Sequence, residues 1–208
     1  MTRIGLAYNQ KPEKAAPSLL EISEAPRPED EPPSTRRDVA SRTTPAALLA
    51  DDEYAEWDEE STIAAVEAAI AGLGEPVRLE ANEDFPEQLR AERPDIVFNM
   101  AEGLLGVNRE AHVPAICEFF GVPYSGSDPF TLSLCLDKAR TKEVLSYHAV
   151  PTAPFALVRD QTALAALRGG RVQAAGGARA GFLRFPVFVK PVHEGSSKGI
   201  TEQNFCRT

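Results

Sequence analysis

The stretch DIVFNMAEGLLGVNREAHVPAICEFFGVPYSG, residues 95–126, carries the pattern that decides the fold. An apolar run at 95–100 predicts a strand, and a polar loop follows it. The next apolar residues recur at helical spacing and predict one buried helix face: Val113, Ile116, Cys117 and Phe120. Gly121 then stops this helix, and a short strand is predicted at 122–126. Strand, helix and strand in this order favour a parallel sheet with helices on its faces.

The same alternation begins near the N-terminus. Residues 3–7 (RIGLA) predict a buried first strand. A helix follows whose apolar face is Ile63, Val66, Ile70 and Leu73, with Asp58 or Ser61 as its cap and Gly72 and Gly74 at its end. A strand at 77–79 and a short helix at 86–92 complete this part of the chain. We therefore predict an α/β class fold with an N-terminal domain at residues 1–125.

One segment interrupts this domain. Residues 11–48 are rich in Pro, Glu, Arg, Ser and Ala, and they include the run APRPEDEPPSTRRD. Such a composition cannot bury enough apolar surface to offset the entropy lost on ordering. We predict a disordered, Pro-rich insertion, and the simplest interpretation gives it no role beyond that of a tether.

A second region is predicted at residues 126–208. Asp128 and Pro129 begin a helix that runs to about residue 149, because a side-chain cap is followed by a residue that needs no donor. The other predicted elements are a strand at 155–158, a helix through 167 capped by Asp160, a strand at 185–191 and a return strand that starts at Ile200. This arrangement places the sequence GSSKG at the tip of a hairpin.

The loop at that tip has the composition of a phosphate site. Backbone amides of a Gly-rich turn can converge on an anion, and the hydroxyls of Ser196 and Ser197 add donors. Lys190 on the preceding strand would add a positive charge. The sequence contains neither the GxxxxGK[ST] nor the GxGxxG pattern. An ordinary hairpin with a polar turn is the alternative interpretation.

Two further segments carry candidate residues. Lys138 lies at the edge of a predicted apolar stripe in LCLDKARTK and, taken alone, is typical of a solvated lysine on a core helix. The loop after the strand at 95–100 is unusually polar, since it contains Asn99, Glu102, Asn108, Arg109 and Glu110. Ligands bind at the carboxyl ends of parallel strands in α/β proteins, although an ordinary loop and helix start would have the same composition.

In order and spacing, these segments together resemble the D-alanine–D-alanine ligase family of ATP-grasp enzymes. The motifs are the NREA loop, GVPYSGSDPFTLSLCLDKARTKEVL at 121–145, VPTAPF at 150–155 and FPVFVKPVHEGSSKGI at 185–200. The resemblance implies an N-terminal pre-ATP-grasp domain followed by the first, incomplete part of an ATP-grasp domain. It also implies a ligase that activates one amino acid as an acyl phosphate, which the amine of a second amino acid attacks. For this family that means joining two D-alanines for peptidoglycan precursors of the cell wall.

The resemblance also assigns roles to residues. It implies that ATP is bound by Lys138, Lys190, Glu194, Gly195, Ser196, Ser197 and Gly199. The loop at 194–199 would close over the phosphates and keep water out. The residues it implies for catalysis are Ser196, Glu102 and Glu60, and either Glu60 or Ser61 would lie near the substrate amine. Mg²⁺ is expected as well, with its ligands in a C-terminal region beyond these residues.

Three departures from the family pattern bear on function. Ala101, Glu102 and Gly103 stand where a His-Gly pair is usual, and the usual Ser-x-Glu-x-x-Val-Ser stretch is replaced by WDEEST. Both changes fall on the amino-acid side, so the substrate could be another amino acid or carboxylate. The chain also stops at Thr208, so we expect a truncated chain that is inactive alone and binds ATP weakly. A non-catalytic module is the alternative, and the DNA just downstream would separate the two.

Composition limits the remaining possibilities. The formal net charge of −9 argues against a nucleic-acid partner. No stretch approaches the roughly 20 apolar residues of a membrane helix, and no signal peptide is visible, so we expect a cytoplasmic protein. The cysteines, Cys117, Cys135 and Cys206, have no metal-site spacing and are expected to be reduced and mostly buried. The partners expected from the resemblance are ATP, small amino acids and a second copy in a homodimer.

Overall fold

A three-stranded parallel sheet forms the N-terminal part of the protein, with strand order β2-β1-β3. The structure is a computed structural model that describes residues 1–12, 54–103, 105–168 and 183–207. The strands of this sheet are β1 (Arg3–Tyr8), β2 (Glu75–Glu80) and β3 (Ile96–Asn99). The predicted α/β class with a parallel sheet is therefore confirmed. The predicted insertion at 11–48 lies outside the described residues from residue 13 onward.

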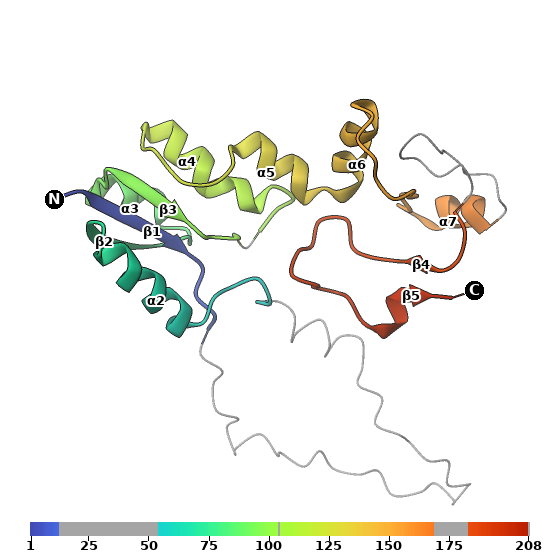
Figure 1. Ribbon diagram of the computed structural model, residues 1–208, viewed down its shortest axis with the longest axis horizontal. Helices are drawn as coiled ribbons and strands as arrows, with labels where there is room; N and C mark the ends of the chain where they lie inside the picture. The colour runs from blue at the N-terminus through green and yellow to red at the C-terminus, as the bar shows by residue number, and fades with distance from the viewer. Residues whose placement is uncertain (13–53, 104, 169–182, 208) are drawn as a thin grey trace, which may run out of the picture.

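Helices cover both faces of this sheet, as Figure 1 shows. The helices around it are α2 (Glu60–Ala71), α3 (Phe85–Glu92) and α4 (His112–Phe120), the last preceded by the 3₁₀ turn η1 (Arg109–Ala111). Side chains alternate along β1, because successive residues of a strand point to opposite faces. Leu6 and Tyr8 pack against α2, whereas Ala7 belongs to a second cluster with the residues of α3 and α4.

The connections at the edge of the sheet match the predicted alternation with one difference. The segment predicted as a strand at 122–126 pairs with β3 only at a single parallel bridge between Val97 and Tyr124. Two backbone hydrogen bonds of 2.8 Å, from Val97 N to Pro123 O and from Ser125 N to Val97 O, fix that bridge. The chain therefore leaves the sheet after one pairing and continues directly into the next helix.

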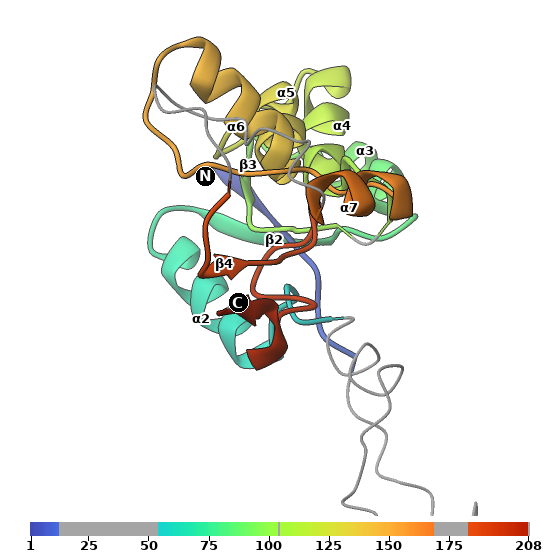
Figure 2. The same cartoon turned by 90° about the vertical axis from the view of Figure 1, so that its right-hand side faces the viewer.

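The second region is less regular. Its elements are α5 (Pro129–Leu136), α6 (Lys138–Tyr147), α7 (Gln161–Arg168), β4 (Val187–Phe188), the turn η2 (Glu202–Asn204) and β5 (Phe205–Cys206). Figure 1 shows α5 and α6 leading from the sheet toward the antiparallel β4–β5 pair at the other end of the molecule, the end that faces the viewer in Figure 2. No helix among the described residues combines the length and apolar character needed to cross a membrane. The predicted domain boundary near residue 125 remains a prediction.

Several predicted elements of this region are wrong in extent. The predicted helix from Asp128 to residue 149 is two helices, because the backbone of Asp137 is extended (φ −81°, ψ 97°) and caps a new helix. Residues 155–158 form no continuous strand, since only Phe155 takes part in a bridge. The strand predicted at 185–191 is only two residues long, and its partner begins at Phe205 rather than at Ile200. Few local signals distinguish such short strands from loops.

Some burial and capping predictions are also wrong. Leu73 is 80% exposed because α2 ends before it, and Phe120 is 37% exposed at the end of α4. Neither Asp58 nor Ser61 caps α2, whose N-cap residue is Glu59 without a side-chain hydrogen bond. Cys117 is buried as expected, but Cys135 is exposed.

Candidate functional site

Asn9, at the carboxyl end of β1, organises the loop that follows β3. Its buried side chain accepts hydrogen bonds from the amides of Glu102 (3.0 Å) and Gly103 (2.8 Å). Its own amide group donates to the carbonyl of Ala81 beyond β2 (2.9 Å). One asparagine therefore ties together the ends of the three strands, at the edge of the sheet where parallel folds place their ligands.

Gly103 allows this loop to turn back on itself. Its φ of +72° lies in the left-handed region, and a Cβ at this position would overlap the backbone carbonyl of Arg109. The indole of Trp57 donates to the carbonyl of Gly103 (3.2 Å) and closes the loop from the other side. The loop therefore presents Glu102 and Arg109 to the same space.

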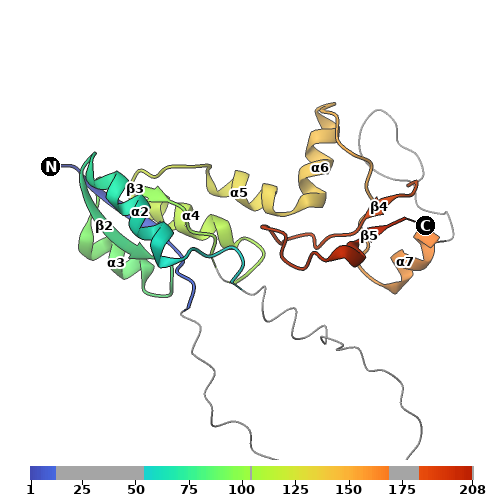
Figure 3. The same ribbon diagram turned by 60° about the horizontal axis from the view of Figure 1, so that its bottom comes forward.

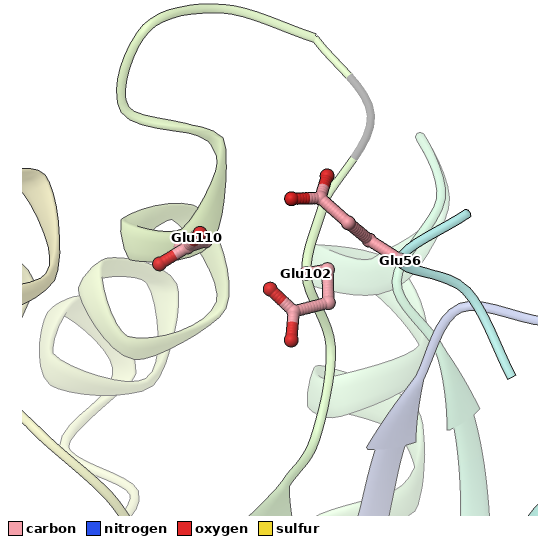
Figure 4. A group of neighbouring side chains, drawn as sticks. All are labelled: Glu56, Glu102 and Glu110. Atoms are coloured by element: carbon pink, nitrogen blue, oxygen red, sulfur yellow. The ribbon is translucent and has the colours of Figure 1, made fainter. Parts of the chain in front are cut away.

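Three carboxylates meet in that space. Glu56, Glu102 and Glu110 come from three separate segments, and one oxygen of each lies within 4.8 Å of the others. Figure 4 shows the three side chains, with Glu56 and Glu110 approaching from opposite sides of the Glu102 segment. We call these three residues the carboxylate cluster. Such a group can attract an ammonium group or a divalent cation.

Crowding of negative charge shifts the acidity of the cluster. Burial, together with the charges of Glu110 and Glu56, raises the pKa of Glu102 to about 7, and Arg109 only partly opposes this. The pKa of Glu110 is also raised, first by burial, although Arg109 lowers it. Near neutral pH the cluster therefore exchanges a proton readily, as a site for an amine or a general base requires.

Arg109 forms a buried ion pair with one member of the cluster. Its Nη2 lies 2.7 Å from Glu56 Oε2, and the two side chains are 5% and 4% exposed. Its Nη1 donates to the carbonyl of His193 (2.8 Å), while Glu56 Oε1 accepts from the amide of Gly195 (2.7 Å). The pair therefore contacts the loop between β4 and β5 at two points. Figure 3 shows that loop reaching back toward α4 and the segment before α2.

Lys138, the first residue of α6, holds the same loop from the other side. Its backbone amide donates to Val192 O (3.2 Å), and its ammonium group donates to the carbonyl of Glu194. The pKa of Lys138 is lowered by burial and, next, by the positive charge of Lys190. The same charge contributes to a lowered pKa of Lys142, after burial. Lys190 is therefore close enough to repel both Lys138 and Lys142, and a group of lysines of this kind is expected around a polyanion.

Lys190 is the least constrained of these lysines. Its ammonium group lies 5.9 Å from the centre of the Phe188 ring, and no acceptor for it occurs among the described residues. Lys142, by contrast, donates to Thr152 Oγ1 (2.9 Å) and Ala153 O (2.8 Å). The hydrogen bonds of Lys142 thus fix its ammonium group to the segment after α6, whereas Lys190 can turn toward a bound anion.

The turn at 195–199 has a constrained backbone. Ser196 (φ 43°) and Ser197 (φ 63°) occupy the left-handed region, which is unusual for residues other than glycine. The amide of Lys198 donates to Gly195 O (2.8 Å), and that of Ile200 donates to Ser197 O (3.0 Å). Glu194 lies 3.4 Å from Lys198 and 3.5 Å from Arg109. The turn is held in a definite shape rather than left as an open flap.

The first turn of α6 adds a further link to the loop. Asp137 caps the helix by accepting from the amides of Ala139 (3.0 Å) and Arg140 (2.9 Å), and its other oxygen lies 3.3 Å from His193 Nε2. Burial tends to raise the pKa of Asp137, but those amides and His193 outweigh it, so the pKa is lowered. The cap therefore positions both Lys138 and His193.

The structure brings most of the predicted site residues together. The positions predicted to bind ATP lie around the contact between α6 and the loop: Lys138, Lys190, Glu194, Gly195, Ser196, Ser197 and Gly199. Glu102 lies in the carboxylate cluster, which Glu56 joins to the loop. Glu60 lies elsewhere, in the first turn of α2, where it pairs with Arg78 (2.8 Å). Its predicted contact with a substrate amine remains a prediction.

Sequence reasoning missed Glu56. It lies in the segment YAEWDEES, where acidic residues are frequent and none is marked by spacing. Its partners Arg109 and Gly195 are 53 and 139 residues away in the sequence. The Trp57 that follows it is the one local sign of a buried turn, because a large aromatic residue in a polar segment needs a place to pack.

Comparisons with known proteins support the resemblance that the motifs indicate. The chain is 34% identical over 166 residues to a D-alanine–D-alanine ligase of Ruegeria pomeroyi, covering 78% of this chain and 49% of that protein. It is 34% identical over 140 residues to the D-alanine–D-alanine ligase of Stutzerimonas stutzeri, covering 67% and 40%. An uncharacterized protein of Sinorhizobium fredii is 38% identical over 116 residues, covering 56% and 30%. The resemblance to the D-alanine–D-alanine ligases is thereby confirmed, and the chain spans half or less of the length of these relatives.

Two solved structures also align with part of the chain. A crystal structure of D-alanine–D-alanine ligase from Bacillus anthracis aligns with a TM-score of 0.43 at 18% identity, covering 88% of this chain and 50% of that one. A crystal structure of the same enzyme complexed with ATP aligns with a TM-score of 0.40 at 19% identity, covering 80% and 45%. No family model matches the chain.

Proposed function

We propose that this chain supplies the N-terminal α/β part and the phosphate loop of an ATP-dependent carboxylate–amine ligase. Its curated relatives are named D-alanine–D-alanine ligases, so joining two D-alanines through an acyl phosphate is the leading reaction. A single observation carries the proposal. The ammonium group of Lys138 donates to the carbonyl of Glu194, directly before the turn at 195–199, and lies close enough to Lys190 for the two charges to repel each other. The predicted cytoplasmic location and the role in peptidoglycan precursor synthesis follow from that reaction.

The proposed roles follow from charge and hydrogen-bond donors. Phosphoryl transfer needs positioning and neutralisation of charge more than covalent help from the protein. Lys138 and Lys190 would neutralise phosphate oxygens, and the hydroxyls of Ser196 and Ser197 would orient them. An anion would also relieve the repulsion that lowers the pKa of Lys138. Glu194 and Gly195 would hold the loop over the phosphates, and Gly199 would provide its positive φ of 71°.

The carboxylate cluster would serve the amino-acid side of the site. An ammonium group placed among Glu56, Glu102 and Glu110 would meet negative charge on several sides. At a pH near 7, Glu102 could accept the proton that an attacking amine must lose. In this role Glu102 would take the place of the His-Gly pair that is usual in the D-alanine–D-alanine ligase family. Glu102 therefore remains one of the proposed catalytic residues.

A divalent cation is a second occupant to consider for the cluster. Carboxylate oxygens are the ligands that Mg²⁺ prefers. Glu56 already accepts two hydrogen bonds from Arg109 and one from Gly195, so a metal would have to displace a buried guanidinium. The cluster therefore fits an ammonium group better than Mg²⁺. The Mg²⁺ expected for the reaction would neutralise phosphate charge, and we propose no ligands for it among the described residues.

Nucleotide binding to the 208-residue chain tests the proposal. The ³¹P resonances of ATP should shift and broaden on titration with the chain, with a dissociation constant weaker than micromolar. Lys190→Met and Lys138→Met should each weaken binding by about tenfold, since each removes a charged contact with phosphate. Lys11→Met is the matched control, because Lys11 pairs with the exposed Glu59 at 3.4 Å and has no proposed role in the site.

The outcomes separate the proposal from its alternatives. Equal binding by all three lysine variants, or no binding by the unsubstituted chain at millimolar ATP, would contradict the proposed phosphate site and favour a non-catalytic module. In a longer protein that carries these residues, Lys190→Ala or Ser196→Ala should nearly abolish ATP-dependent dipeptide formation. Phosphate release with a panel of D- and L-amino acids would identify another substrate, which the Ala101-Glu102-Gly103 departure favours.

A further inference from the structure

Arg109, in the turn before α4, makes a hydrogen bond to the loop at 192–200. One guanidinium group donates to a carboxylate of the segment before α2 and to a carbonyl of the loop. A planar guanidinium can serve two partners at fixed angles, whereas a lysine ammonium acts as a point charge. We propose that Arg109 is a positioning residue that fixes the loop over the carboxylate cluster. It does so directly at His193 and, at Gly195, by holding the Glu56 carboxylate that accepts the Gly195 amide. The proposal deepens the proposed function, on which it rests for the loop's role in binding phosphate.

One oxygen of Glu56 joins Arg109 to the loop. Its Oε1 accepts both from Arg109 Nη2 (2.9 Å) and from the amide of Gly195 (2.7 Å). A Cβ on residue 195 would collide with that same oxygen, so the loop can come this close only because residue 195 is glycine. The loop is therefore docked on a carboxylate that Arg109 holds in place.

Burial makes the contact sensitive to single changes. The side chains of Arg109 and Glu56 are almost fully buried, so either charge left alone would be poorly solvated. The network is not fully satisfied, however. Arg109 Nε is buried without a hydrogen-bond partner among the described residues, and Glu194 Oε2 has only the ion-pair contacts with Lys198 (3.4 Å) and Arg109 (3.5 Å). An unpaired buried donor reduces the net stability of such a network.

The position of Glu56 also connects the two halves of the proposed site. Glu56 belongs to the carboxylate cluster and, at the same time, accepts from the loop. An ammonium group bound by Glu102 and Glu110 would add a positive charge beside the carboxylate of Glu56, which Arg109 and Gly195 share. Arg109 is thus the residue that relates occupancy on the amino-acid side to the position of the loop on the phosphate side.

Hydrogen exchange of the 208-residue chain without nucleotide tests the inference. In Arg109→Gln, the amides of the loop peptide covering 190–200 should exchange about 10- to 100-fold faster, the change expected for one or two lost hydrogen bonds to charged groups. In the double variant Arg109→Gln with Glu56→Gln, which leaves no buried charge alone, amides of β1, β2 and β3 should change less than about twofold if Arg109 positions the loop rather than the fold. Arg109→Lys should give an intermediate value, because it keeps the charge beside Glu56 but cannot reach His193 as well.

Arg3 provides a matched control. It also contacts a glutamate carboxylate, that of Glu92 at 2.7 Å, and the backbone carbonyl of the same residue, but its side chain is 35% exposed. Arg3→Gln should leave the loop exchange unchanged. Unchanged loop exchange in Arg109→Gln, or an equal increase in Arg3→Gln, would overturn the inference.

Two additions keep the test decisive. If Arg109→Gln does not fold, the double variant Arg109→Gln with Glu56→Gln removes both buried charges and should show the same loop release. Exchange confined to the sheet in that variant would count against the inference. The measurement contains no nucleotide, so failure of the unsubstituted chain to bind ATP would contradict the proposed function while leaving the loop result to stand by itself.

Discussion

Arg109 and Glu56 lie 53 residues apart in the sequence and form the most buried ion pair among the described residues, with 2.7 Å between Nη2 and Oε2. Their side chains are 5% and 4% exposed, whereas the other arginines that form ion pairs in the described chain, Arg3, Arg78 and Arg140, are about one-third exposed or more. This contrast makes the pair the most sensitive electrostatic position of the structure.

Removal of one partner should therefore destabilise the protein strongly. We expect Arg109→Met to lower the free energy of unfolding by about 3–5 kcal/mol, because Glu56 would remain buried without its counter-charge. Urea unfolding followed by circular dichroism measures this. Arg3→Met should cost no more than about 1 kcal/mol, since its pairs are partly exposed. A loss below about 1 kcal/mol in Arg109→Met would show that solvent reaches the pair.

Gly103 should tolerate no side chain. Gly103→Ala combines a φ of +72° with overlap against the backbone carbonyl of Arg109, so we expect a loss of more than about 2 kcal/mol in unfolding free energy. Gly121→Ala is the matched control, because its φ is +69° and nothing lies within 4 Å of the added methyl group. It should cost about 1 kcal/mol for the backbone conformation alone. Equal losses in the two variants would contradict the close approach at Gly103.

The raised pKa of Glu102 predicts a pH dependence of stability. The value is about 7 in the folded protein and 4.5 in its ordinary range, so between these values the folded chain holds a proton that the unfolded chain releases. Stability therefore falls as the pH rises through this window and stays lower above it. Glu102→Gln should remove this dependence and raise the unfolding free energy at pH 8, relative to pH 5, by about 1–2 kcal/mol after partial solvent screening.

A direct titration checks the same point. Carbon-detected NMR of the Glu102 carboxyl group should give a midpoint near neutrality, and Glu110→Gln should move it downward, since the Glu110 charge is the second cause of the shift after burial. A midpoint at the ordinary value of a glutamate would mean that the carboxylates do not crowd one another in solution.

Asp137 should matter more than an ordinary helix cap. Asp137→Ala and Asp128→Ala both remove a capping carboxylate, so each should lower the free energy of unfolding, by about 0.5–2 kcal/mol in the case of Asp137→Ala. Only Asp137 also contacts His193, at 3.3 Å. Limited proteolysis should therefore cleave the chain at 192–200 faster in Asp137→Ala than in Asp128→Ala. The same cleavage rate in both would mean that the His193 contact does not restrain the loop.

Local patterns in the sequence are enough to predict the N-terminal sheet. The run at 3–7, the apolar spacing from Ile63 to Ile70 and the glycine after Phe120 each depend on neighbouring residues, and the structure has the corresponding elements. The same reasoning fails where tertiary contacts decide the outcome. Asp137 breaks the predicted long helix because its carboxylate caps α6 and contacts His193, 56 residues later in the chain.

The candidate site is predictable in part for the same reason. The lysines and the Gly-Ser turn belong to contiguous motifs, so residue type and order along the chain are enough to identify them. The role of Glu56 depends on two partners far away in the sequence, and no local pattern indicates a buried charge. Glu60, which lies near Glu56 in the same acidic run, has a local partner in Arg78 and faces a different surface.

The bridge between Gln10 and Asp58 has a practical consequence. Lys11 N donates to Asp58 O (2.8 Å), and Asp58 N donates to Asn9 O (2.9 Å). These two hydrogen bonds hold the two ends of segment 12–57 side by side. The entropy of closing a segment between fixed ends changes by only about 0.6 kcal/mol for each doubling of its length. A spectroscopic reporter or an affinity tag spliced into the middle of that segment should therefore leave Asn9, and the strand ends it gathers, in register.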